Sequence, residues 1–176
     1  MFGLFKPKPA PEGPVAFQYA ADFACSAEEL YRIIDYGDDI CWKRDVGSVE
    51  ATGASSFRMV LDMLPEHAFL LDISEAKPGK SYAYDCKADP QVGRLIGTTE
   101  SYDIDPIDDS NCRVTLSVAA DFEAGMTRAE WQQEVEMMAL GVNNSLAKLK
   151  IHAEMGVDTI REIEAEQILA MGDTRH

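Results

Sequence analysis

Few side chains of this sequence are suited to acid–base chemistry, and the main candidates are Glu100, His67 and His152. Glu100 lies in an alternating segment in phase with Ile96, Thr98, Tyr102 and Ile104. If that phase faces the interior, burial raises the pKa of the Glu100 carboxyl group and suits it to act as a general base or to accept a ligand hydroxyl. The opposite phase places Glu100 in solvent, and the polar alternation around it leaves both orientations open.

The histidines and cysteines show no ligand spacing. His67 follows a predicted turn, and His152 lies near the end of a long predicted helix, where an imidazolium gains from the helix dipole. Proton transfer requires either histidine to lie inside a cavity, and a metal site requires both to converge with carboxylates. The four cysteines form no CxxC or Cys/His pattern. We therefore predict no metal and no cofactor. Because nucleophile and nucleotide motifs are absent, the sequence leaves open whether the chain is an enzyme.

A larger set of aromatic, methionine and aliphatic side chains lies on faces that should point inward. Methionine is pliable, and tyrosine joins an apolar body to a polar tip, so these residues suit an apolar ligand of variable shape. They are equally suited to filling a core. Trp42 in particular could cover a cavity entrance or plug the junction of helix and sheet. The residues that we predict to line a ligand site are Trp42, Met59, Leu71, Tyr82, Tyr84, Tyr102, Met138 and Val142.

The elements that must position these side chains follow from periodicity. Residues 15–23 alternate and predict a half-buried strand. Ser26 then caps a short helix that ends near residue 34, and a second short helical piece follows at about residues 40–43. From residue 46 to residue 122 the period is two, with frequent turn signals, so we predict an antiparallel meander of at least five strands.

The last third of the chain is predicted to be helical. Thr127 and Glu130 make a capping box, and an apolar stripe from Trp131 to Ala153 predicts one long helix that stops at Gly156. Asp158 is placed to cap a shorter amphipathic piece. One long helix covering one antiparallel sheet predicts an α+β fold in which the curved sheet wraps around the helix. Such a geometry can leave a cavity between sheet and helix, where small ligands bind. The pair Asn143 and Asn144 in this helix either reaches the sheet or a ligand with one amide, or is exposed.

This order of elements resembles the SRPBCC superfamily, which has the START-type helix-grip fold of birch-pollen-allergen-like proteins and polyketide cyclases. The resemblance rests on the opening strand and helix, where residues 15–25 run into the sequence SAEELY at 26–31, and on the strand ending near Phe122 before the long helix. It implies an internal cavity that binds a hydrophobic small molecule such as a lipid or a polyketide. Some members are cyclases or chaperone regulators, so a cyclase/dehydratase-type enzyme and an interaction protein are the alternatives.

Length and charge bound the remaining expectations. The 176 residues fit one domain, and a net charge of −15 repels phosphate backbones, so we expect no nucleic-acid partner. The sequence shows neither a membrane span nor a signal peptide, which together with unpaired thiols predicts a cytoplasmic protein. We predict a mobile leader over 1–14, a helix-grip domain over 15–156 and an acidic, partly helical tail over 157–176. The apolar stripe of that tail must be buried against another surface, which is either a second copy of the chain in a homodimer or the chain's own sheet.

Overall fold

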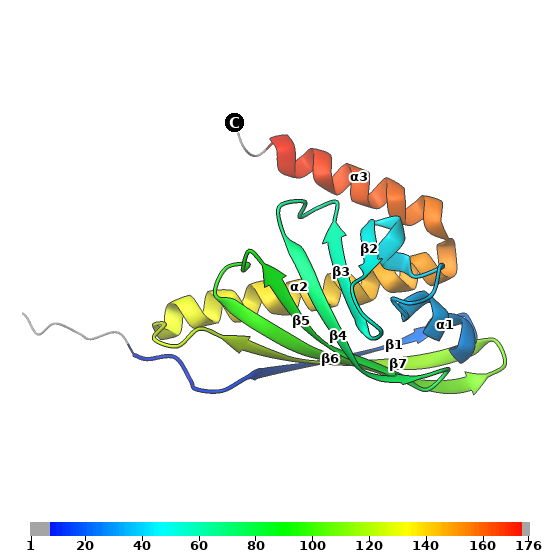
Figure 1. The fold of residues 1–176 in the computed structure, drawn as a ribbon, viewed down its shortest axis with the longest axis horizontal. Coiled ribbons are helices and arrows are strands. Elements are labelled where there is room, and N and C mark those ends of the chain that lie inside the picture. The colour runs from blue at the N-terminus through cyan, green and yellow to red at the C-terminus, as the bar shows by residue number, and fades with distance from the viewer. Residues whose placement is uncertain (1–7, 174–176) are drawn as a thin grey trace, which may run out of the picture.

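The computed structural model describes residues 8–173, in which most of the strands follow one another without an intervening helix. A strand and two short helices come first, six strands follow, and two helices end the chain (Figure 1). The elements are β1 (Val15–Phe23), α1 (Ala27–Ile34), the 3-10 helix η1 (Trp42–Asp45), β2 (Gly47–Ala51), β3 (Ser56–Leu61), β4 (Ala68–Lys77), β5 (Ser81–Asp89), β6 (Leu95–Asp108), β7 (Asn111–Phe122), α2 (Arg128–Met155) and α3 (Val157–Asp173).

The strands form one antiparallel sheet in the order β1-β7-β6-β5-β4-β3-β2. From β2 to β7 each strand pairs with the next along the chain, because each connection is a short turn. β1 then pairs with β7, which brings the first and last strands side by side. The sheet curves strongly, and α2 runs along its concave side (Figure 1). The predicted α+β architecture, a curved antiparallel sheet around one long helix, is confirmed.

The two short helices begin where local side chains satisfy the backbone. The Ser26 hydroxyl accepts a hydrogen bond from the Glu29 N–H at 3.2 Å and caps α1, whose apolar face is buried. The second helix, expected at about residues 40–43, is a 3-10 helix over Trp42–Asp45. The Asp38 carboxylate accepts from the Ile40 N–H at 3.1 Å, and the Cys41 N–H donates to the Asp38 carbonyl at 3.2 Å. Because this turn occupies residues 38–41, the helix begins only at Trp42.

The long helix α2 is packed tightly in its second half only. Both hydrogen bonds of the capping box are present: the Thr127 N–H donates to Glu130 at 2.7 Å, and the Glu130 N–H donates to the Thr127 hydroxyl at 3.3 Å. The buried residues of α2 are Val142, Leu146, Leu149 and His152. In the first half, Trp131, Val135 and Met138 are half-buried, and Met137 is exposed. The apolar face is therefore continuous, but only its second half lies in the core.

The last helix packs on its own chain. α3 begins at Val157, so Asp158 lies in its first turn instead of ahead of it. It contacts α2 and η1, and Ile160 is fully buried there. Glu164 of α3 forms an ion pair with Lys148 of α2, and the Lys148 amine also contacts the Met63 sulfur at 3.2 Å.

Near the N-terminus, residues 8–10 run beside the start of α2. There the Arg128 N–H donates to the Lys8 carbonyl at 2.8 Å, and the Ala10 N–H donates to the Met126 carbonyl at 3.1 Å.

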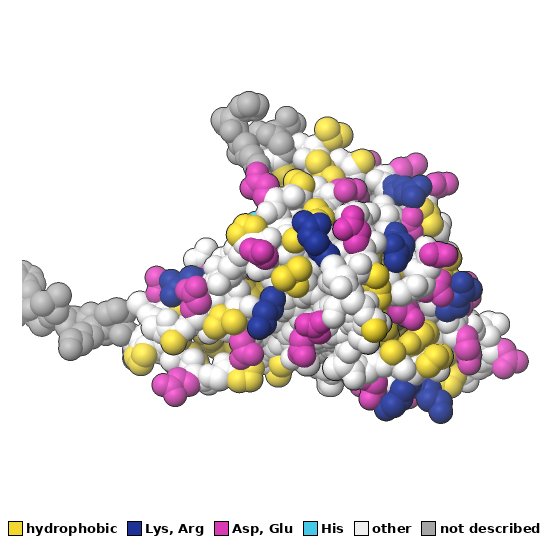
Figure 2. Space-filling view, viewed as in Figure 1, with side chains coloured by type: hydrophobic (Ala, Val, Ile, Leu, Met, Phe, Trp, Pro, Cys, Tyr) yellow, Lys and Arg dark blue, Asp and Glu magenta, His cyan; other side chains and the backbone are white. Residues whose placement is uncertain are grey.

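On the face of the molecule seen in Figure 2, the acidic charge is dispersed. Figure 2 shows acidic side chains spread over the viewed face, with basic and apolar side chains between them. Within residues 8–173, no helix combines the length and the apolar content that a membrane crossing needs.

Candidate functional site

The inner face of β5 and β6 carries the polar centre of the molecule. The two strands pair with Tyr82 opposite Tyr102, Tyr84 opposite Glu100 and Cys86 opposite Thr98. Residues that alternate along a strand share a face, and Tyr82, Tyr84 and Tyr102 are buried. Glu100 therefore points inward with the tyrosines, which resolves the orientation that the sequence leaves open.

Glu100 accepts two hydrogen bonds from neighbouring hydroxyl groups. The Tyr84 hydroxyl donates to its Oε2 at 2.7 Å, and the Thr98 hydroxyl donates to its Oε1 at 2.9 Å. The Glu100 side chain is half-buried, so solvent still reaches part of it. One donor on each oxygen leaves further lone pairs free to accept from a ligand.

A cluster of tyrosines surrounds this carboxylate. Tyr36, in the turn after α1, places its ring 5.3 Å from that of Tyr84 in an edge-to-face contact, and the two hydroxyl groups lie 3.4 Å apart. The Tyr36 N–H donates to the Tyr82 hydroxyl at 3.2 Å. Burial, and after it the charge of Glu100, holds the pKa of Tyr84 and of Tyr102 well above the usual range. These phenols are therefore neutral hydrogen-bond donors at physiological pH.

A lysine from η1 enters the same region. The Lys43 amine lies 3.4 Å from the Ser145 hydroxyl of α2 and 3.9 Å from the centre of the Trp42 ring. Burial lowers the pKa of Lys43 to about 8, and the negative charge of Glu100 is the strongest opposing influence. No ion pair among the described residues includes Lys43. The site thus combines a carboxylate with an amine that is not held by a direct salt bridge.

The thiols near the site are protonated. Burial, and then the charge of Glu100, raises the pKa of the Cys86 thiol to about 12. Burial likewise raises the pKa of Cys41 to about 11. Because the thiolate is the nucleophilic form, neither cysteine is activated at neutral pH. Residues 8–173 also contain no group of three or more His, Cys, Asp or Glu side chains that could hold a metal ion.

The eight residues predicted to line a ligand site all lie on the interior side of the fold, and they differ in their degree of burial. Trp42 is buried in η1. Met138 is half-buried in the first half of α2. The predicted residues that are buried are Trp42, Met59, Leu71, Tyr82, Tyr84, Tyr102 and Val142.

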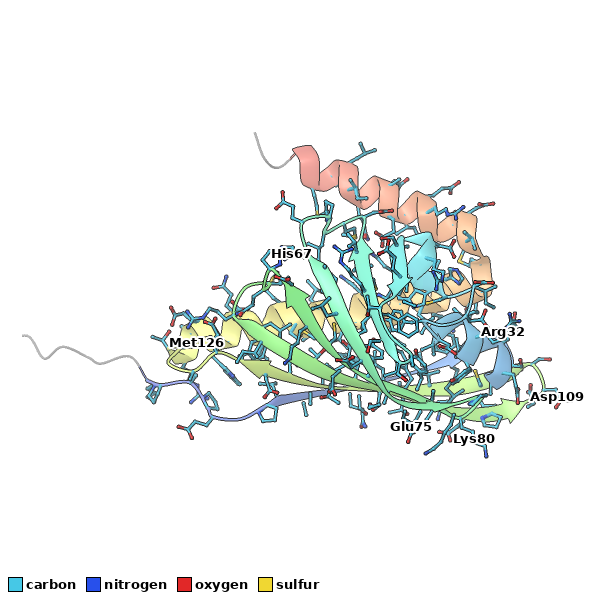
Figure 3. All side chains as sticks on the ribbon, in the orientation of Figure 1. Arg32, His67, Glu75, Lys80, Asp109 and Met126 are labelled. Atoms are coloured by element: carbon cyan, nitrogen blue, oxygen red, sulfur yellow. The ribbon has the colours of Figure 1, made fainter. Side chains whose placement is uncertain are left out.

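Neither internal histidine lies in this site. His67 immediately precedes β4, at the edge of the fold, with Nδ1 2.8 Å from the Pro90 carbonyl oxygen (Figure 3). His152 is buried near the end of α2, where its Nε2 lies 2.9 Å from Asp45 of η1. Asp45 also pairs with Arg161 of α3 at 2.9 Å. His152 thus belongs to the contact between η1 and the two C-terminal helices.

Sequence reasoning missed four polar residues of the site: Tyr36, Lys43, Ser145 and Thr98. Ser145 had a usable signal, because it follows Val142 by three residues and Met138 by seven, which places it on the same helix face. Asn143 and Asn144 are both exposed instead. Lys43 had no such signal, because a single 3-10 turn shows no periodicity.

Several side chains on the facing surfaces of the sheet and of the first half of α2 remain partly accessible to solvent. Inner-face residues of a closed core are fully buried, yet Phe69, Cys86 and Glu100 on the sheet are half-buried, and so are Val135 and Met138 on α2. Glu134 of α2 lies against the β5–β6 turn, so this half of the helix stays beside the sheet. Two hollows elsewhere are shallow features of the surface, one beside Lys8 and Arg128 and one over β1, β6 and β7.

Comparison with solved structures identifies the architecture. The allergen Ara h 8.0201 aligns with 88% of this chain and 99% of its own, at a TM-score of 0.59 and 11% sequence identity. The aromatase/cyclase Zhui from Streptomyces sp. R1128 aligns with 88% and 96%, at a TM-score of 0.58 and 12% identity. The chain has the helix-grip fold. A protein from Bacillus thuringiensis with this fold aligns at a TM-score of 0.61 and 10% identity, over 80% of this chain and 99% of its own.

The helix-grip fold expected from the sequence resemblance is thereby confirmed. No protein-family model and no curated protein sequence matches the chain. At identities of 10 to 12%, the structural relatives establish the fold and leave the function to the site.

Proposed function

We propose that the chain binds a hydrophobic small molecule, of the lipid or polyketide kind, between the sheet and the first half of α2. The observation that carries this proposal is the half-burial of apolar side chains on both facing surfaces, with Phe69 on β4 and Met138 on α2 as examples. Apolar groups that remain wet inside a fold gain free energy when a ligand covers them, by about 25 cal/mol per Å².

The polar groups beside this apolar surface give a ligand its orientation. Glu100 offers free acceptor positions, Tyr84 offers a neutral phenol, and Lys43 offers a donor amine. Ligand sites commonly combine an apolar lining with a few convergent polar groups. An amphipathic molecule with a hydroxyl or carbonyl group at one end fits this arrangement. The net charge of −15 supports a small molecule over a nucleic acid as partner.

Binding is tested with the full chain in two measurements. Native mass spectrometry of the purified protein should show a co-purifying apolar molecule, and titration with 1-anilinonaphthalene-8-sulfonate should saturate at one dye per chain. Dodecanoic acid and dodecanol should displace the dye. Saturable dye binding that neither molecule displaces would place the dye elsewhere, and the absence of both a bound mass and saturable dye binding would refute the proposal.

A cyclase or dehydratase activity in the same space is the second candidate, because one observation favours it. Glu100 faces inward and accepts from Tyr84, so a carboxylate and a phenol lie together where a bound chain would pass. The Streptomyces relative is an aromatase/cyclase, at 12% identity. An enzyme of this class requires Glu100 for turnover but not for binding. Loss of dye binding in Glu100→Gln would instead favour a purely binding role.

A further inference from the structure

The beginning of the described chain is tied to the first turn of α2. The Arg128 N–H donates to the Lys8 carbonyl at 2.8 Å, and the Ala10 N–H donates to the Met126 carbonyl at 3.1 Å. The first described residues and the start of α2 therefore lie at the same end of the molecule (Figure 1). Residues 1–7 precede this anchor and lie outside the described residues. They start from the end of α2 that stands beside the proposed ligand space.

An apolar surface is accessible at this end of the fold. Ile96, near the start of β6, is 48% exposed, and Trp131, Val135 and Met138 on α2 are half-buried. We call these four residues the apolar rim. Glu134 of α2 lies against the β5–β6 turn, so the two elements that carry the rim adjoin here. Accessible apolar side chains that gather in one place mark a docking surface.

We propose that residues 1–7 fold back from their anchor and cover the apolar rim, so that the chain's own N-terminal segment shields the proposed ligand space when no ligand is bound. The segment has suitable chemistry, because Phe2, Leu4 and Phe5 are large and apolar. This inference rests on the proposed function in one respect, since the segment and the ligand then compete for the same surface.

The segment is long enough to cover the rim. Met138 lies ten residues along α2 from Arg128, which is about 15 Å of helix. Seven extended residues span up to about 23 Å. Lys6 and Lys8 each precede a proline, and a residue in that position favours an extended backbone. The apolar part of the segment, residues 2–5, therefore comes alongside the rim.

Charge favours the chain's own segment over a second copy. Residues 128–140 of α2 contain one arginine and three glutamates, a net charge of −2, whereas residues 1–8 contain two lysines and no acidic residue. The segment is therefore attracted to the first half of α2. Two whole chains, each with a net charge of −15, repel one another.

Photo-cross-linking of the full chain tests the placement. Phe5 is replaced by p-benzoylphenylalanine, the protein is irradiated at low concentration, and peptide mass spectrometry locates the attachment. We expect attachment to Met138 or another rim residue at least fivefold more often than to Met137, which points outward with 66% of its surface exposed. Dodecanol should suppress this cross-link. Attachment to a second copy, equal attachment to Met137 and Met138, or no attachment to α2 or β6 overturns the inference.

Dye titration tests the competition with a ligand. Leu4→Ser combined with Phe5→Ser removes two apolar side chains of the segment, so this variant should bind 1-anilinonaphthalene-8-sulfonate at least threefold more tightly than the unaltered chain. Leu169→Ser is the control, because it removes a 72% exposed side chain of α3, and it should leave the affinity unchanged. Unchanged affinity in the double variant overturns the inference and leaves the proposed function standing. A cross-link to Met138 without dye binding in any variant refutes the proposed function and leaves the covering of the rim standing.

A lipid surface is the alternative partner of a basic, apolar segment. The full chain and the Leu4→Ser, Phe5→Ser variant are therefore sedimented with vesicles of phosphatidylcholine and phosphatidylglycerol. We expect neither to sediment with the vesicles. Sedimentation that requires Leu4 and Phe5, together with no cross-link to α2, would assign the segment to a membrane and overturn the inference.

Discussion

The Tyr84 hydroxyl donates to Glu100 at 2.7 Å, and the two residues lie directly opposite each other in the β5–β6 ladder. The strand register places Glu100 on the inner face beside Tyr84, and burial, followed by the charge of Glu100, raises the pKa of Tyr84 and keeps its phenol neutral. It also links the sheet to η1, since the charge of Glu100 favours the protonated form of Lys43. One carboxylate thereby influences both groups that are available to a ligand.

Replacement of Glu100 by glutamine should lower the pKa of Lys43 below its present value of about 8. Glu100 raises that pKa by favouring the ammonium form, so removal of the negative charge leaves burial less opposed. The pH midpoint for reductive methylation of Lys43, measured by peptide mass spectrometry, should therefore move to lower pH. Glu50→Gln on the exposed face of β2 is the control and should leave the midpoint in place. An unchanged or higher midpoint in Glu100→Gln would contradict the electrostatic link.

A bulkier side chain at Met138 should block the proposed ligand space. Met138 is half-buried against the core, whereas its neighbour Met137 points outward with 66% of its surface exposed. We expect Met138→Trp to weaken dye binding at least fivefold, because the indole occupies volume that the ligand needs. Met137→Trp adds the same bulk on the outer face and should bind dye normally. Equal affinities in the two variants would show that the dye does not bind beside α2.

The main elements were predictable from sequence because their signals are local. The caps at Ser26 and Thr127 depend on residues three positions away, and strand alternation needs only a few neighbours. The orientation of Glu100 was not predictable, because β6 carries hydroxyl residues on both faces, such as Thr98 inside and Thr99 outside. Its pairing with Tyr84 decided the matter, and pairing is a relationship between separate segments of the chain.

Lys43 shows the same limit for a site residue. Its neighbourhood is assembled from η1, α2 and β6, which are separated by long stretches of chain. A lysine in a short irregular helix is ordinarily a surface residue. Its half-burial and its contact with Ser145 of α2 depend on tertiary structure, so no local pattern could have indicated them.

Truncation of Leu149 should destabilise the fold far more than truncation of Leu140 on the same helix. Leu149 is 1% exposed and lies in the packed half of α2, whereas Leu140 is 57% exposed. We expect Leu149→Ala to cost about 2 to 5 kcal/mol of unfolding free energy, because it loses apolar burial and leaves a cavity. Leu140→Ala should change it by less than about 0.5 kcal/mol. Urea denaturation followed by circular dichroism measures both, and similar losses would contradict the one-sided packing of α2.

The ion pair between Lys148 and Glu164 should hold α3 against α2. Its side chains are only 14% and 9% exposed, so loss of one partner leaves an uncompensated, largely buried charge. We expect Glu164→Gln or Lys148→Met alone to cost about 3 kcal/mol in urea unfolding. The combination of Lys148→Met with Glu164→Leu should recover most of that loss, because apolar groups of similar size replace both charges.

The pair Lys150 and Glu154 is a matched control on the same helix. These side chains are 41% and 26% exposed, and exposed pairs contribute about 0 to 1 kcal/mol. Glu154→Gln should therefore change the unfolding free energy by less than about 1 kcal/mol. Additive losses in the Lys148 and Glu164 variants, or equal losses at the two pairs, would show that α3 is held by Ile160 and its apolar neighbours instead of by the buried charges.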